Sequence, residues 1–398
     1  MRGLRWTTAG ESHGQGLVGV LEGMPAGLEL SLERIDAELA RRQGGYGRSP
    51  RQLIEKDRIE LLSGTRHGRT LGSPLAFRLK NKDHSIEKLD VPTTPRPGHA
   101  DLAGCQRLGS RDIRAVLERA SARETAARVA LGSMARQLLE AFDIEVFAHV
   151  VALGGEEACP TALDAAFDAA GDERRAIRAA SAFHCLDPDA ERRFRERVDR
   201  AAEEEDSLGG VFEVRALSLP PGLGTYTDPR ERLTARLGGA LFSIPAMKGV
   251  EFGLGFAAAA RPGSEVHDAI ELAPPATGPG AAQGARGTGG FGRFRRASNR
   301  AGGLEGGMTT GEPLVVRVAM KPIPTLRRGM PTVDLETGEP VQAVYLRSDV
   351  TAVPAASVVG EAVLALELAG AFLETFGGPS MDAVRAAWEA WRVRVQEV

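Results

Sequence analysis

The stretch Gly10-Glu11-Ser12-His13-Gly14-Gln15-Gly16, near the start of the chain, determines how we interpret the fold around it. Its three glycines allow backbone angles that other residues avoid and remove side-chain bulk, so a ligand can lie against the main chain. Ser12 and His13 add a hydroxyl and a group that titrates near neutrality. The apolar run from Leu17 to Leu21 predicts a buried strand that anchors the loop. The simpler interpretation is a glycine-rich turn with an incidental histidine, because short glycine motifs recur by chance.

Length, composition and charge indicate a globular protein. The chain has 398 residues, of which 42% are hydrophobic, enough for a sizeable core. The formal net charge of -3 argues against a protein that coats nucleic acid. We see no apolar run approaching the roughly 20 residues that cross a bilayer, and no signal-peptide pattern follows Met1. We therefore expect a cytoplasmic protein without a membrane span.

The cysteines indicate neither a disulfide framework nor a metal site. Cys105, Cys159 and Cys185 are odd in number and far apart, and no two of them form a CxxC pair. Such cysteines are typical of reduced thiols. We therefore expect no bound metal.

Arginine greatly outnumbers lysine, with only six lysines among 50 basic residues. A GC-rich genome or a warm habitat explains the excess as a whole. The informative arginines lie beside glycine or serine, where a guanidinium group can hold a carboxylate or phosphate through two parallel hydrogen bonds. The loop from Arg41 to Pro50 carries three arginines within eight residues, and a bound polyanion would relieve their repulsion. A solvated basic surface loop fits this segment equally well.

Hydrophobic periodicity predicts a mixture of helices and strands. Ser31 is a candidate N-cap, and His67 is expected in the turn of a hairpin. The expected helices run from Ser31 to about Arg42, from about Asp112 to Phe142, from Asp187-Pro188, from Asp228-Pro229 through Leu241, and from about Pro354 to Phe376; the expected strands include Leu75 to Leu79, Val211 to Leu219 and Leu314 to Met320.

A second histidine lies in the stiff loop Pro95-Arg96-Pro97-Gly98-His99-Ala100-Asp101. Its prolines fix the backbone and Gly98 removes bulk, so His99 is presented to a ligand much as His13 is. Farther along, Arg119 and Arg123 are four residues apart, and we expect them on one face of the predicted helix. Small residues between them would let a flat ligand approach. An exposed helix face with Arg123 paired to an acid is the alternative.

Residues 274 to 311 form the most unusual stretch of the chain. Glycine and alanine dominate from Gly278 to Gly290, and arginines interleaved with glycine and phenylalanine follow. This composition is typical of RNA-binding tracts, in which rings stack on bases and charges follow the phosphates. The tract is short, however, and the whole chain is net negative. We therefore favour a mobile loop that orders over an anionic ligand, with RNA binding by residues 286 to 303 as the second hypothesis.

Taken in series, these segments resemble the chorismate synthase family in order and spacing. The motifs that carry the resemblance are Gly10 to Gly16, Pro97 to Asp101, Arg119 to Thr125, Gly303 to Gly307, Lys321 to Thr325 and Arg347-Ser348-Asp349. The resemblance covers the whole chain and implies one domain over residues 1–398. It implies an α+β fold in which helices are sandwiched between antiparallel β-sheets, associated as a homotetramer.

The family's reaction gives the arginine loops a purpose. The resemblance implies conversion of 5-enolpyruvylshikimate 3-phosphate to chorismate, the last common step of the shikimate pathway to the aromatic amino acids. This carbon–oxygen lyase reaction removes phosphate and a C6 proton by anti-1,4 elimination, without net redox change. It needs reduced FMN, which would lend an electron as the phosphate leaves and help remove the C6 hydrogen near its N5 atom. NADPH is a candidate reductant, and a separate flavin reductase is a candidate partner.

The resemblance also implies site residues. As catalytic groups it implies His13, an acid for the departing phosphate kept protonated by surrounding anions; His99, near N1 of the flavin; and Asp349, near N5. As substrate ligands it implies Ser12, Arg42, Arg48, Ser121, Arg123 and Arg347. As FMN contacts it implies Arg119, Ala120, Ser121, Pro245, Ala246, Gly306, Lys321, Pro322, Ile323, Pro324, Thr325 and Arg347. Arg42 and Arg48 also match positions associated with NADP.

Three positions depart from the family pattern. Thr351 occupies a position where cysteine is usual, Ser348 replaces a frequent histidine, and Thr309-Thr310 replaces a more usual pair such as Ser-Asn. None of these changes removes a proposed catalytic group. A third functional hypothesis, a flavin reductase that mainly oxidises NADPH, lacks a recognisable Gly-x-Gly-x-x-Gly turn between a strand and a helix.

Overall fold

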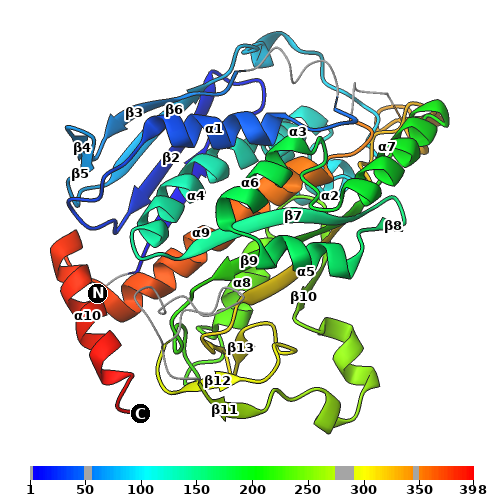
Figure 1. Cartoon of the computed structure of the whole chain (residues 1–398). Coiled ribbons are helices and arrows are strands. Elements are labelled where there is room, and N and C mark those ends of the chain that lie inside the picture. Colours follow the sequence, from blue (N-terminus) through cyan, green and yellow to red (C-terminus); the bar gives the residue numbers. More distant parts are fainter. Residues whose placement is uncertain (1–2, 49–55, 274–290, 344–348) are drawn as a thin grey trace.

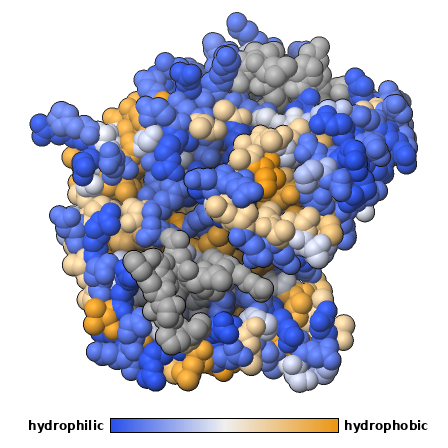
Figure 2. Space-filling view, in the orientation of Figure 1, coloured by the Kyte–Doolittle hydropathy of each residue, from blue (hydrophilic) through white to orange (hydrophobic). Residues whose placement is uncertain are grey.

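A layer of helices lies between two antiparallel sheets in the computed structural model, which describes residues 3–48, 56–273, 291–343 and 349–398. Figure 1 shows the four-stranded sheet on one side of these helices and the five-stranded sheet on the other. The structure therefore confirms the expected α+β sandwich. Figure 2 shows a mainly hydrophilic surface on which apolar residues form small groups.

The first sheet has the order β1-β2-β6-β3 and supports the glycine loop. Its strands are β1 (Arg5–Ala9), β2 (Gly16–Glu22), β6 (Leu75–Lys80) and β3 (Ile59–Ser63). Leu17 and Leu21 of β2 are fully buried, which confirms the predicted anchoring strand. The short hairpin β4 (Thr65–Arg66) and β5 (Arg69–Thr70) turns at His67, whose φ of 50° confirms its place in a turn.

The second sheet has the order β10-β15-β9-β7-β8. Its strands are β10 (Met247–Phe252), β15 (Leu314–Met320), β9 (Gly210–Leu217), β7 (Glu145–Leu153) and β8 (Glu156–Glu157). In β15 the alternate residues Leu314, Val316 and Val318 are fully buried, as period-two alternation requires. The strand has the bounds that its sequence predicts.

The central layer consists of α1 (Leu32–Gln43), α4 (Thr125–Glu140) and α9 (Val353–Phe376). Ser31 caps α1 by accepting a hydrogen bond from the Arg34 amide, as predicted. Helices α4 and α9 cross so closely that a Cβ on Gly132 would overlap the backbone carbonyl of Ala362. Only a residue without a side chain fits at this crossing.

Helix α9 corrects one expectation from the sequence. It is 24 residues long and its most apolar window has a mean hydropathy of 1.7, so it is long and apolar enough to cross a membrane. The structure buries 94% of its most apolar window inside the protein, between the two sheets. A helix that is apolar on all sides is typical of the centre of a large core. Its composition therefore reflects burial in this fold.

The remaining elements surround this core. The other helices are α2 (Asp101–Leu108), α3 (Ile113–Ala120), α5 (Pro160–Asp168), α6 (Gly171–Ala180), α7 (Pro188–Glu203), α8 (Leu233–Phe242) and α10 (Met381–Arg394). Short hairpins are formed by β11 (Ile270–Leu272) with β12 (Phe294–Arg296), β13 (Leu304–Glu305) with β14 (Met308–Thr309), and β16 (Pro331–Val333) with β17 (Pro340–Gln342). Residues 274–290 of the expected mobile loop lie outside the described residues.

Two helix predictions are wrong in detail. The single helix expected from Asp112 to Phe142 is interrupted at Ser121, whose extended backbone (φ -66°, ψ 144°) ends α3. The Ser121 hydroxyl then accepts a hydrogen bond from the Arg123 amide and starts a short 3₁₀ turn. Helix α8 begins at Leu233, and Asp228 instead forms a turn by accepting from the Arg230 amide. In both segments a side chain competes with the helix for backbone hydrogen bonds.

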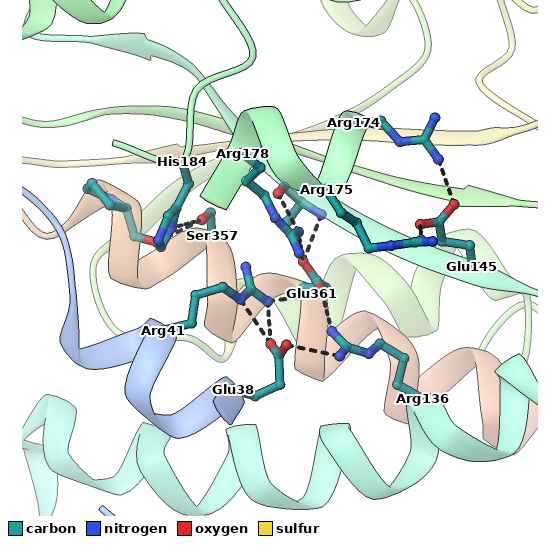
Figure 3. Close-up of polar contacts among 12 residues, drawn as sticks. Glu38, Arg41, Arg136, Glu145, Arg174, Arg175, Arg178, His184, Ser357 and Glu361 are labelled. Carbon is teal, nitrogen blue, oxygen red and sulfur yellow. Dashed lines mark hydrogen bonds and ion pairs between the residues drawn. The ribbon is translucent and has the colours of Figure 1, made fainter. Parts of the chain in front are cut away.

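A buried ionic network ties the central helices to α6 (Figure 3). Glu361 of α9 pairs with Arg136 of α4, with Arg178 of α6 at 2.8 Å and with Arg41 of α1 at 3.0 Å. Burial alone would raise the pKa of Glu361, but the three guanidinium groups lower it below its ordinary value. The carboxylate is therefore charged and satisfied in the core.

Candidate active site

Asn81 organises the glycine loop. Its side-chain amide donates to the backbone carbonyls of Glu11 (3.0 Å), Ser12 (3.2 Å) and Gly14 (2.8 Å). Asn81 is only 7% exposed. Gly10 has a φ of 110°, and a Cβ there would overlap the carbonyl of Gly16. The loop therefore has a fixed shape that depends on glycine and on one buried amide.

His13 is held by a carboxylate at the end of α3. Nδ1 of His13 lies 3.0 Å from Oε1 and 3.1 Å from Oε2 of Glu118, and the His13 amide donates to Oε2 over 2.8 Å. Glu118 is 3% exposed and also accepts a hydrogen bond from Arg114 at 3.0 Å. The structure thus pairs His13 with an acid that the sequence analysis did not identify.

Three arginines converge beside this loop with two carboxylates. Arg123 binds both oxygens of Asp57, at 2.8 and 2.7 Å, and donates from Nε to Asn81 over 2.9 Å. Arg42 lies 3.9 Å from Asp57, and Arg48 pairs with Asp349 at 2.7 Å. The structure therefore brings together Arg42, Arg48, Arg123 and Asp349 from three separate segments, as a common anion site requires.

The electrostatics of this cluster favour an anionic ligand. The pKa of Arg42 is lowered to about 10, chiefly by burial and also by the charges of Arg48 and Arg123, against the opposing effect of Asp57. Burial likewise lowers the pKa of Arg48, although Asp349 opposes this. Nε of Arg48 is buried and has no hydrogen-bond acceptor among the described residues. A bound phosphate or carboxylate would add negative charge beside both guanidinium groups and supply the acceptor that Nε of Arg48 lacks.

The break at Ser121 separates two residues expected on one helix face. Arg119 donates to the carbonyls of Gly10 (3.2 Å) and Thr8 (3.1 Å), whereas Arg123 binds Asp57. The expectation that Arg119 and Arg123 share one helix face is therefore wrong. The Ser121 hydroxyl instead reaches the Ser12 hydroxyl at 3.2 Å, which joins the α3 end to the glycine loop.

His99 belongs to a second cluster, in the loop before α2. Its Nδ1 lies 2.6 Å from Oδ1 of Asp101, and Arg96 binds the same carboxylate at 2.7 and 3.0 Å. Burial alone would raise the pKa of Asp101, but the hydrogen bonds from His99 and Arg96 lower it well below its ordinary value. A carboxylate thus faces each of the two histidines that the sequence singles out.

The segment from Lys321 to Thr325 lies against the His99 loop. Lys321 donates to the carbonyl of Gly98, and burial and the nearby charge of Lys248 both lower the pKa of Lys321. The Lys321 amide donates over 3.0 Å to Ala246, whose φ of 73° is unusual for a residue other than glycine. The predicted FMN contacts at 245–246 and 321–325 are therefore neighbours in space, next to His99.

The other predicted contacts are more scattered. Gly306 lies in the β13–β14 hairpin, whose strand β14 contacts α8. A Cβ on Gly306 would meet no atom of the described residues within 4 Å, so the space next to it is open. Ala120 is the last residue of α3. Arg347 and its neighbour Ser348 lie outside the described residues.

Sequence reasoning missed the polar partners of the predicted residues. Asp57, Asn81 and Glu118 come from separate segments and lie in no motif used in the sequence analysis. Their role becomes visible only when long-range contacts are known, because an acid or an amide is ordinary in a surface loop. Asp101 carried a weak signal, since it lies two residues after His99 within the same motif.

Comparison with known proteins identifies the family to which the chain is similar. The family model for chorismate synthase matches residues 4–373. Curated relatives named chorismate synthase include one from Trichlorobacter lovleyi, 51% identical over 394 residues, covering 96% of this chain and 97% of that protein. Another, from Desulforudis audaxviator, is 52% identical over 390 residues, covering 95% of this chain and 94% of that protein.

A solved structure shows the same fold. A crystal structure of chorismate synthase superposes with a TM-score of 0.78 at 41% sequence identity and covers 100% of both chains. The similarity therefore extends over the whole length of both chains. On the family model, the relatives and the fold together, this chain belongs to the chorismate synthase family.

Proposed function

We propose that the chain converts 5-enolpyruvylshikimate 3-phosphate to chorismate by anti-1,4 elimination of phosphate, with reduced FMN bound. The observation that supports this most is the cluster of Arg42, Arg48 and Arg123 beside His13. The substrate carries one phosphate and two carboxylates, and buried guanidinium groups match such anions in charge and geometry. This family's reaction therefore gives the cluster a chemical purpose.

The arginine cluster binds and orients the substrate in this proposal. Arg42 and Arg48 hold anionic groups in a buried setting, where such interactions are stronger than in water. Arg123 is already fixed by Asp57 and Asn81, so little side-chain entropy is lost on binding. Ser12 and Ser121 contribute hydroxyl groups next to the loop, and Arg347 is the remaining proposed ligand.

His13 provides a proton for the leaving phosphate. General acid catalysis requires a donor within hydrogen-bond reach of the leaving oxygen, and the glycine loop removes the bulk that would block that approach. The Glu118 carboxylate lies 3.0 Å from Nδ1 of His13 and orients the ring. His13 can thus give its proton to the phosphate as the C3–O bond breaks.

The residues around Lys321 fit a flavin nucleotide. Lys321 and Lys248 repel each other, and an anionic phosphate or reduced ring would relieve that repulsion. The contacts proposed for FMN are Arg119, Ala120, Ser121, Pro245, Ala246, Gly306, Lys321 to Thr325 and Arg347. When bound, reduced FMN supplies a transient electron that favours departure of the phosphate.

Two further groups would act on the flavin in this proposal. His99, paired with Asp101, would stabilise the reduced ring, and Asp349 would assist in removal of the C6 hydrogen. Asp349 is ion-paired to Arg48, so a ligand that engages Arg48 would also affect this carboxylate. We further propose a cytoplasmic homotetramer whose flavin is reduced by NADPH, directly at Arg42 and Arg48 or through a separate reductase.

RNA binding has less support. Arg295 pairs with Glu271 at 3.1 Å and Arg296 pairs with Glu305 at 2.6 Å, so these two arginines of the tract are engaged by acids of the same chain. Guanidinium groups held in this way are poorly placed to follow an RNA backbone.

One anaerobic assay tests the proposed function. Purified protein is mixed with 5-enolpyruvylshikimate 3-phosphate and chemically reduced FMN, and chorismate and free phosphate are measured. Equal amounts of both products are expected. No product, together with tight RNA binding or rapid NADPH oxidation, would overturn the proposal. Chorismate formed from oxidised FMN and NADPH alone would show that the chain reduces its own flavin.

A further inference from the structure

We infer that Glu118 is a positioning residue that acts on turnover through His13, an inference that rests on the proposed function of the site. Glu118 contacts both the imidazole and the backbone amide of His13. It therefore fixes the ring and the loop that carries it at the same time. No motif used in the sequence analysis includes this contact.

The geometry identifies the nitrogen of His13 that Glu118 holds. Nδ1 lies within 3.1 Å of both oxygens of a carboxylate that is 3% exposed. An ionised carboxylate only accepts hydrogen bonds, so Nδ1 carries the proton in this contact. In the proposed mechanism Nε2 is the nitrogen that gives or takes the catalytic proton. A carboxylate that fixes the tautomer of a catalytic histidine in this way is a known device in proteases.

The surroundings hold Glu118 itself in place. Arg114, one turn earlier on α3, donates to Oε1 over 3.0 Å, and the Ser12 amide donates to the Glu118 backbone carbonyl over 3.1 Å. The Glu118 carboxylate thus accepts hydrogen bonds from three donors: the His13 ring, the His13 amide and Arg114. Two bridges, one from its side chain and one from its backbone, join the α3 end to consecutive loop residues.

A glutamine cannot reproduce this arrangement. Its side chain has one acceptor oxygen, while its amide nitrogen is a donor. With the oxygen toward the His13 amide and ring, the nitrogen would face Arg114, another donor. With the oxygen toward Arg114, the nitrogen would face His13 and favour the tautomer with the proton on Nε2. Glu118→Gln keeps the volume and loses the charge and at least one hydrogen bond.

The chain offers a matched control in the pair His149 and Glu213. Nε2 of His149 lies 3.2 Å from Oε1 of Glu213, and both residues are fully buried in the five-stranded sheet. This pair also joins a histidine to a glutamate, but burial there lowers the pKa of His149 and holds the ring away from solvent. Glu213→Gln therefore breaks a similar contact outside the proposed site.

The experiment is a double-mutant cycle with the anaerobic chorismate assay. Glu118→Gln is expected to lower kcat by about 10²-fold, within the ~10²–10⁴ that general acid–base catalysis contributes, with little change in KM for the substrate. Combined with His13→Ala, the same substitution should lower kcat no further, because a residue that acts through His13 has no effect once the imidazole is gone. Glu213→Gln should leave kcat near the wild-type value.

Several outcomes would overturn the inference. They are an unchanged kcat in Glu118→Gln, a His13→Ala variant that turns over normally, or losses that multiply in the double variant as two independent defects would. A wild-type protein that forms no chorismate would instead defeat the proposed function. The positioning role is then decided by a crystal structure of Glu118→Ala. A His13 ring that has left its present orientation supports positioning, and an unmoved ring contradicts it.

Discussion

Nε of Arg123 donates to Oδ1 of Asn81 over 2.9 Å, and this bond joins the arginine cluster to the glycine loop. The amide nitrogen of the same side chain holds three loop carbonyls. One buried residue therefore sets the distance between the groups proposed to bind the substrate and the histidine proposed to protonate it. A substitution at Asn81 should therefore affect both the arginine cluster and the position of His13.

Asn81→Ala should weaken substrate binding and lower stability. The carbonyls of Glu11, Ser12 and Gly14 lose their common donor, at a cost of about 1–3 kcal/mol for an unsatisfied buried group. We expect KM to rise about tenfold, measured with reduced FMN, and urea unfolding to show the loss of stability. Asn299→Ala removes a single bond to Pro313, elsewhere in the fold, and should leave KM unchanged. An unchanged KM in Asn81→Ala would show that Asn81 does not couple the arginine cluster to the glycine loop.

Arg123→Lys should raise KM more than it lowers kcat. A lysine keeps the charge but cannot bind both oxygens of Asp57 and the Asn81 carbonyl in one plane. We expect KM to rise by about 10–100-fold, consistent with the loss of one or two charge-assisted hydrogen bonds. Arg236→Lys, in an ion pair with Glu367 and Glu374, is the matched control and should keep its KM. Equal KM values for the two variants would exclude Arg123 from substrate binding.

His13→Ala and His99→Ala should each lower turnover while substrate affinity stays largely intact. Each removes a proton-carrying ring and leaves the arginine cluster in place. We expect kcat to fall by about 10²–10⁴-fold, the usual range for general acid–base groups. Equilibrium binding of the substrate, followed without flavin, gives the affinity. Near-normal turnover in either variant rejects the role of that histidine.

Stability should fall between about pH 6.5 and pH 4 because of His184. Burial, together with the charges of Arg41 and Arg178, lowers the pKa of His184 from 6.5 to about 4. Between these values the unfolded chain binds a proton that the folded chain does not, so the folded state loses stability as pH falls and has its full stability above pH 6.5. For this one residue the loss between about pH 7.5 and about pH 5 is about 2 kcal/mol.

His184→Gln isolates that contribution, because its amide can still donate to the Pro354 carbonyl that His184 Nδ1 contacts at 3.1 Å. The difference in unfolding free energy between wild type and variant should shrink as pH falls through this window. A difference that does not change with pH would show that His184 titrates alike in the folded and unfolded states.

Gly132→Ala should destabilise the protein strongly. A Cβ at this position would overlap the Ala362 carbonyl where α4 crosses α9, and neither backbone can move without disturbing the core. We expect a loss of about 2–3 kcal/mol, measured by chemical unfolding. Gly239→Ala on α8 is the control, because a Cβ there would meet nothing within 4 Å. It should be neutral or stabilising by up to about 1 kcal/mol.

Much of the fold could be predicted from local sequence. Leu314–Met320 and Val353–Phe376 were predicted to within a residue because alternation or sustained apolarity is followed within two residues by proline or glycine. The break at Ser121 could not be predicted, because apolar periodicity continues on both sides of it. Only the contact of the Ser121 hydroxyl with Ser12, far away in sequence, makes an interrupted helix the better arrangement.

The candidate site likewise contains residues that local sequence predicts and residues that only the fold reveals. His13, His99 and the arginines lie in glycine- or proline-containing motifs, whose local chemistry marks them as unusual. Asn81, Asp57 and Glu118 became identifiable only when the fold brought them together. Local chemistry therefore identifies the groups that face a ligand, while their supporting partners depend on tertiary structure.

The place of α9 in the chain has a consequence for biosynthesis. Helix α9 packs against β7 and β9 and is encoded late in the sequence, at residues 353–376, whereas both strands are complete by residue 217. During translation these strands of the second sheet therefore leave the ribosome long before the helix that covers their apolar face. The nascent chain must keep that face from aggregating until α9 has been synthesised. A ribosome that stalls before Phe376 would release a product that cannot complete its core.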